Sequence, residues 1–148
     1  MLDQGQVARD LYRKIQELFP EFKPFVLEGD EENATMALRD LIDSLEQENA
    51  SPEDVDLMER LDRFRGWVGE YPQGDDASND IFTYFNVTFV EGILEHDSLY
   101  RLAPAIVAKE TLIQGKEYFC TWIGPTEYHR ALTAFPEELT AFPEEEAL

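Results

Sequence analysis

The fold is decided by the stretch IFTYFNVTFVEGIL, residues 81–94, which is rich in large apolar side chains. Its content of phenylalanine, threonine, valine and tyrosine has the local propensity of a β-strand. Strict alternation, however, would place Asn86 among the large apolar side chains of one face. The large side chains instead recur at every fourth residue, at Ile81, Phe85, Phe89 and Ile93. This spacing predicts a buried central helix over Ile81–Leu94, with a cap near Ser78 or Asp80.

Three longer helices are expected before this stretch. Apolar residues at helical spacing predict helices over about Asp3–Phe19 and Asn33–Asn49, and Pro20 ends the first of them. Ser51 is expected to cap the third helix with Pro52 in its first position, because serine is a preferred cap and proline suits the first turn. The inward face of this third helix is expected to consist of Val55, Met58, Leu61, Phe64 and Val68.

Shorter helices are expected in the last third of the chain. They span Pro104–Gly115, Lys116–Ile123 and Thr126–Phe135. The predicted fold class is therefore all-α, with about six or seven stacked antiparallel helices around the central apolar helix. With 148 residues, the chain is expected to form a single helical domain over 1–135, followed by an acidic tail over 136–148.

The end of the chain contains a perfect duplication. The segment LTAFPEE occupies residues 132–138 and occurs again at 139–145. Proline in each copy excludes one continuous helix. Leu132 and Phe135 of the first copy are expected to pack onto the domain. The second copy either frays or docks on a neighbouring chain to form a homodimer, and fraying is favoured because two large side chains must offset the ordering entropy of the whole segment.

The net charge is the strongest single fact about the composition. The chain has 32 acidic and 12 basic residues, a net charge of -20, which repels nucleic acid and anionic membranes and favours a basic protein partner. No apolar run is long enough to span a membrane, and Met1 to Asp10 contains no apolar segment of signal-peptide length. Cys120 is the only cysteine, which excludes an internal disulfide and favours a cytoplasmic location.

Few residues offer catalytic chemistry. Glu91 lies in the most apolar helix, so it is expected either at the helix edge or buried and paired with one of Arg60, Arg63, Arg65 or Arg101. Structural pairing is favoured over catalysis at this position. His96 follows the same helix, where a histidine suits the negative end of the dipole. Cys120 lies among aromatic residues, and it would need His96 or His129 nearby to act as a nucleophile.

An acidic cluster over 75–80 invites comparison with a calcium-binding loop. It lacks the glycine at the sixth position and the glutamate at the twelfth position that such a loop requires. Helix capping and a solvated loop are favoured instead for this cluster. For the chain as a whole, no residue is assigned a catalytic, cofactor-binding or metal-ligating role. The cluster consists of Asp75, Asp76, Asn79 and Asp80.

Three stretches carry a resemblance to a known family. They are Leu18–Phe22, Leu57–Trp67 and Phe85–Leu94. Together they resemble a family of small, acidic, all-helical bacterial proteins of unknown function, over about residues 11 to 123. The chain departs from the family pattern at Gly92 and in its repeated tail. The resemblance brings no catalytic residues, and it implies protein binding, in some members the neutralisation of toxins.

These observations favour one hypothesis and leave two alternatives open. The hypothesis is a non-enzymatic protein-binding domain that neutralises a basic partner such as a toxin. The first alternative is a small hydrolase-type enzyme that uses carboxylates near Glu91 and His96. The second is a structural homo-oligomeric scaffold.

Overall fold

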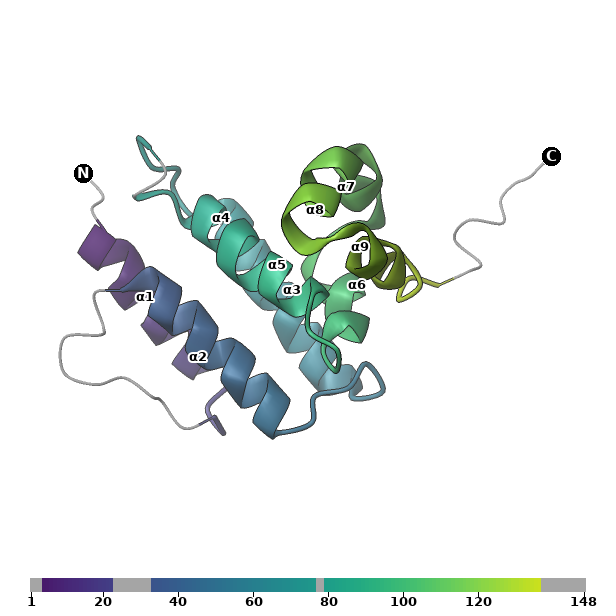
Figure 1. Cartoon of the computed structure of the whole chain (residues 1–148). Helices are drawn as coiled ribbons and strands as arrows, with labels where there is room; N and C mark the ends of the chain where they lie inside the picture. The colour runs from purple at the N-terminus through teal and green to yellow at the C-terminus, as the bar shows by residue number, and fades with distance from the viewer. Residues whose placement is uncertain (1–3, 23–32, 77–78, 137–148) are drawn as a thin grey trace.

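The computed structural model describes residues 4–22, 33–76 and 79–136, and it is all-helical over these ranges, as predicted (Figure 1). The helices α1 and α2 pack side by side, and the rod formed by α4, η3 and α5 packs on α2 and α3. The shorter elements cover the far end of this rod. In chain order the elements are α1 (Gln4–Leu18), α2 (Ala34–Gln47), α3 (Val55–Glu70), α4 (Ile81–Tyr84), the π-helix η3 (Phe85–Val90), α5 (Glu91–Leu94), the 3-10 helix η4 (Tyr100–Leu102), α6 (Ala103–Ile106), α7 (Lys109–Gln114), α8 (Lys116–Ile123) and α9 (Pro125–Leu132).

The start of α3 differs from the prediction. Asp54, not Ser51, is the cap, because its backbone is extended and its carboxylate accepts the Leu57 N–H at 3.1 Å. Pro52 lies in the turn before the helix, which the Asp54 N–H closes on the Ser51 carbonyl at 3.0 Å. Val55, predicted to face inward, is 67% exposed because it occupies the first helical position, beyond the packed part of α3.

The predicted central helix is confirmed, and it contains a feature that the periodicity did not indicate. The cap is Asp80, which accepts the Thr83 N–H at 3.3 Å. From Phe85 to Val90 the rod winds as a π-helix, and the Glu91 N–H reaches back five residues to the Asn86 carbonyl. The apolar side chains at four-residue spacing are all buried, and Phe85 and Phe89 pack edge-on against Phe64 of α3.

The helix predicted over Pro104–Gly115 is wrong in one respect, because it is two helices. The backbone of Val107 is extended, with φ −152° and ψ 146°, and it separates α6 from α7. Lys116–Ile123 is helical as predicted, and Gly124, at φ +100°, turns the chain into α9.

The last helix is shorter than predicted, and it ends at Leu132 rather than Phe135. Leu132 and Phe135 are half-buried against the core, which confirms the prediction for the first copy of the repeat. The second copy lies outside the described residues, as does Asp3, the expected cap of α1. In the described ranges, no helix has both the length and the apolar character needed to cross a membrane.

Candidate functional site

Among the residues that the structure describes, Glu91 is the one acidic residue that is buried. It is 8% exposed, and its Oε2 accepts a hydrogen bond from the Tyr118 hydroxyl at 2.5 Å. The π-helix places Glu91 at the start of α5, and α8 brings Tyr118 over it. Burial, together with this hydrogen bond to a carboxylate, raises the pKa of Tyr118 to about 12. The hydroxyl therefore remains protonated and donates to Glu91 at neutral pH.

The predicted partner of Glu91 was wrong. Glu91 pairs with Tyr118 and with none of the four arginines proposed for it. Arg60 is directed away, toward the turn after α1, where it pairs with Glu21, and Arg101 pairs with Glu53. A tyrosine can satisfy a buried carboxylate without bringing a second charge into the apolar interior.

Glu91 belongs to an acid cluster, which we define as Glu91, Glu95 and Glu127. Burial raises the pKa of Glu95, and the negative charges of Glu91 and then Glu127 raise it further. Across 4–22, 33–76 and 79–136, no lysine, arginine or histidine forms an ion pair with any member of the cluster. Glu95 and Glu127 therefore carry negative charge without a described ion-pair partner, whereas the buried Glu91 already accepts the Tyr118 hydroxyl.

The residues proposed for the enzyme alternative are directed to different neighbours. The His96 Nε2 lies 3.3 Å from the Glu46 carboxylate on α2, and its Nδ1 lies 3.2 Å from the Ser98 N–H. Glu91 instead engages Tyr118 on α8. Within the part of the chain that the structure describes, no hydrogen bond or ion pair joins His96 to Glu91.

Cys120 and His129, the other residues of the nucleophile hypothesis, are not joined by a described hydrogen bond. Cys120 is half-buried against the core. The His129 Nδ1 lies 2.8 Å from the Pro125 carbonyl of its own helix, so this nitrogen carries the hydrogen and donates. Neither histidine makes a described hydrogen bond with the thiol.

The capping role expected for the acidic loop is confirmed. Asp80 caps α4 and also accepts the Gly74 N–H at 3.2 Å, while the Asn79 side-chain oxygen accepts the Asp76 N–H at 3.1 Å. The side-chain oxygens of Asp80 and Asn79 therefore accept hydrogen bonds from nearby backbone N–H groups. Among the described residues, no three histidine, cysteine or acidic side chains converge in a way that would hold a metal ion, and this includes the acid cluster.

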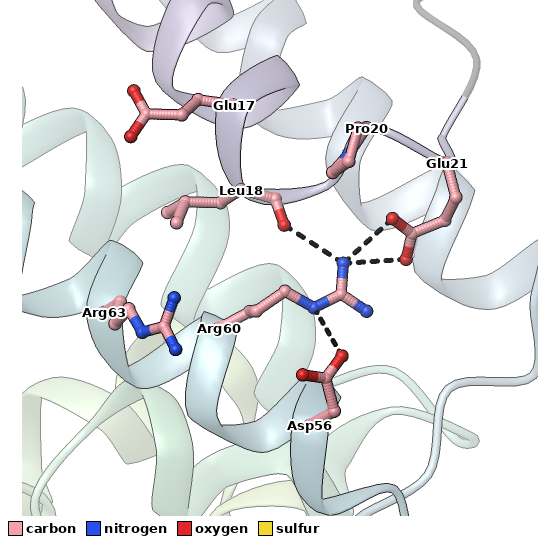
Figure 2. A pocket seen from close by; sticks show the side chains of 7 residues that line it. All are labelled: Glu17, Leu18, Pro20, Glu21, Asp56, Arg60 and Arg63. Carbon is pink, nitrogen blue, oxygen red and sulfur yellow. Dashed lines mark hydrogen bonds and ion pairs between the residues drawn. The ribbon is translucent and has the colours of Figure 1, made fainter.

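The surface also has a pocket of about 410 Å³ between the end of α1 and the first half of α3 (Figure 2). Arg60 fills its floor, where one nitrogen lies 3.0 Å from the Leu18 carbonyl and 2.8 Å from the Glu21 carboxylate. The Arg60 Nε also pairs with Asp56 at 3.0 Å. Arg60 therefore connects α3 to the end of α1 and to the turn after it. Because its guanidinium is already paired within the protein, Arg63 is the main charge in the pocket that remains available to a ligand.

Sequence reasoning missed two residues beside the acid cluster. Tyr118 and Trp122 are 43% and 63% exposed, and their ring centroids lie 6.3 Å apart. Both lie in the predicted helix Lys116–Ile123, which the sequence marks only as apolar. The sequence does carry a signal, because Tyr118 and Trp122 are four residues apart and so share one face of the helix. Phe119 and Ile123 form a neighbouring stripe that is buried, which leaves the first pair facing outward.

Comparison of the chain with protein families, curated proteins and solved structures finds no match.

Proposed function

We propose that this chain is a non-enzymatic binding protein whose acidic surface captures a basic protein, with the neutralisation of a cationic toxin such as a nuclease as its sharpest form. The observation that supports this proposal best is the acid cluster. The negative charges of Glu91 and Glu127 raise the pKa of Glu95, none of the three carboxylates forms an ion pair among the described residues, and Glu91 is buried. A basic partner would supply the missing positive charge.

The net charge strengthens the proposal through the rate of association. With a net charge of -20, the chain attracts a cationic protein over distances of the order of the Debye length. Such steering raises association rates far above those of neutral pairs, and added salt removes the gain. A reducing cytosol is the proposed compartment, because the single cysteine cannot form an internal disulfide.

The two alternatives receive less support from the geometry. The enzyme alternative needs Glu91 and His96 in one site, and these residues contact different helices. The homo-oligomeric scaffold requires copies that each carry a charge of -20 to associate, which like-charge repulsion opposes at low ionic strength.

The test is affinity capture from the native organism, followed by kinetics with the purified partner. The expected partner has a basic isoelectric point, and its association rate constant falls by about tenfold or more between low and physiological ionic strength. A partner that is acidic, or whose association rate does not respond to salt, would contradict the proposal. Hydrolysis of the partner by this chain would favour the enzyme alternative.

A further inference from the structure

We infer that a groove between α1 and α3 binds a small aromatic anion, meaning a molecule that carries a carboxylate or a similar anionic group on a planar ring. Arg63 binds the anionic group in this assignment, and Trp67 contacts the ring. The acid cluster contributes no residue to this groove, so the inference does not depend on the proposed function.

The groove follows from the antiparallel packing of α1 and α3. Toward one end, the Arg60 guanidinium donates to the Leu18 carbonyl at 3.0 Å. Toward the other end, the Tyr71 hydroxyl donates to Asp10 at 2.5 Å. Along this face the surface carries two pockets, of about 410 Å³ and about 220 Å³, and Glu17 belongs to the walls of both. We therefore treat the two pockets as one groove.

Charge decides which ligand fits, because every carboxylate that lines the groove forms an ion pair with a lysine or arginine of the same groove. These pairs are Asp10–Arg13, Glu17–Lys14, Glu21–Arg60 and Asp56–Arg60. Arg63 is exposed, lines the larger pocket and makes no ion pair or hydrogen bond with the described residues (Figure 2). A guanidinium binds a carboxylate through two parallel hydrogen bonds. An anion therefore finds an unpaired partner in the groove, whereas a cation meets carboxylates that are already paired.

Trp67 supplies an aromatic surface next to this charge. It lines the smaller pocket and follows Arg63 by four residues on α3, so the two side chains share one face of the helix, with Cβ atoms about 5–6 Å apart. The rings of Phe64 and Tyr71 lie 6.2 Å and 5.2 Å from the Trp67 ring and hold it in place. Lys14 lines the same pocket, and its Nζ lies 5.9 Å from the centre of the Trp67 ring, which adds positive potential. One small molecule can therefore contact the Trp67 ring and the Arg63 guanidinium together.

The probe is the naphthoate anion. It is compared with naphthamide, which has the same ring without the charge, and with acetate, which has the charge without the ring. NMR follows the indole N–H signals of the two tryptophans, and the spectrum of Trp122→Phe assigns them. Trp122 is the internal reference, because it is 63% exposed on α8 and lies outside the groove.

We expect naphthoate to shift the Trp67 signal with a dissociation constant of the order of 1 mM. Naphthamide should bind at least about fivefold more weakly, because it cannot form the charged pair with Arg63. Acetate should leave the Trp67 signal unchanged. General attraction to a chain of net charge -20 cannot produce this order, since such a charge disfavours anions.

Two arginine variants test the protein side. Arg63→Met keeps most of the aliphatic stem and removes the guanidinium, so it should weaken naphthoate binding about tenfold. Arg65→Met is the matched control, because Arg65 also lies on α3, lines neither pocket and changes the net charge by the same amount. It should change the dissociation constant by less than about twofold. The NMR spectra of both variants report whether each is folded.

Four results would each overturn the inference. If naphthoate and naphthamide bind equally well, Arg63 does not recognise the anion. If the two arginine variants weaken binding equally, the effect is one of net charge. If the Trp122 signal shifts as much as the Trp67 signal, naphthoate stacks on tryptophan without a specific site. If millimolar naphthoate shifts neither signal, the groove does not bind aromatic anions.

Discussion

Replacing Arg60 with methionine tests the role of the pocket drawn in Figure 2. The guanidinium of Arg60 donates to the Leu18 carbonyl at 3.0 Å, pairs with Glu21 and Asp56, and lies 5.3 Å from the centre of the Phe19 ring. Methionine keeps most of the aliphatic stem and removes these polar interactions. The change therefore removes the hydrogen bond and ion pair that link α3 to the end of α1, without opening a large cavity.

The expected loss follows from the exposure of each partner. The hydrogen bond from the charged guanidinium to the Leu18 carbonyl is the largest contribution, about 1.5–3 kcal/mol, since the Arg60 side chain is only 17% exposed. Glu21 and Asp56 are 47% and 74% exposed, so each ion pair contributes at most about 1 kcal/mol. Because these terms are not additive, we expect a net destabilisation of about 2–3 kcal/mol, or roughly 5–10 °C in Tm.

The assay is urea unfolding followed by circular dichroism, with Arg63→Met as the matched control. Arg63 lies on the same wall of the pocket, is exposed and makes no hydrogen bond or ion pair in the described structure, so its replacement should cost less than about 0.5 kcal/mol. If the two variants are equally stable, Arg60 does not connect the helices, and its guanidinium also becomes available to an anionic ligand.

Three further substitutions test other parts of the structure. The pKa of Glu95 is raised in the folded protein, so protonation of Glu95 stabilises the fold. This stabilisation is fully present below about pH 4.5, the usual pKa of the group, and is lost as pH rises through the raised value. Glu95→Gln should therefore stabilise the protein by about 0.2–0.5 kcal/mol at pH 7 and lose this effect near pH 4, with Glu70→Gln as an inert control in thermal unfolding. Gly124→Ala should destabilise the fold by about 1–3 kcal/mol in urea unfolding, because φ is +100° there, a backbone conformation that residues with a Cβ rarely adopt, and an unchanged midpoint would refute this. Asp54→Ala should cost about 1 kcal/mol and Ser51→Ala clearly less, and the reverse order would restore Ser51 as the cap of α3.

The elements with long, strongly periodic apolar patterns were predictable from the sequence. The spacing of Ile81, Phe85, Phe89 and Ile93 identified the central helix against its strand-like composition, because burial of one stripe outweighs local propensity. The packing of Leu132 and Phe135 was also predicted. Caps were less predictable: Ser51-Pro52 and Asp54 are both good starting signals, and only the backbone conformation chose between them.

The candidate site could not be predicted, because each of its contacts joins residues distant in the sequence. Glu91 and Tyr118 are 27 residues apart, and the expectation that an arginine would pair with Glu91 used charge alone. The packing of α8 against α5 instead places the Tyr118 hydroxyl next to the Glu91 carboxylate. The π-helix was equally hidden, since a four-residue repeat is compatible with α and π windings alike.

The sequence by itself determined the helical class, the buried stripe of the central rod and the negative charge, because these follow from local periodicity and from composition. The resemblance to a family of small acidic helical proteins stays a prediction. Only the tertiary structure decided that Glu91 would accept a hydrogen bond from Tyr118, that Arg60 would connect α1 to α3 and that Phe82, Val87, Tyr118 and Trp122 would remain exposed. The physical reason is that burial, pairing and exposure depend on which helices meet, and a side chain's partner is chosen by distance in space.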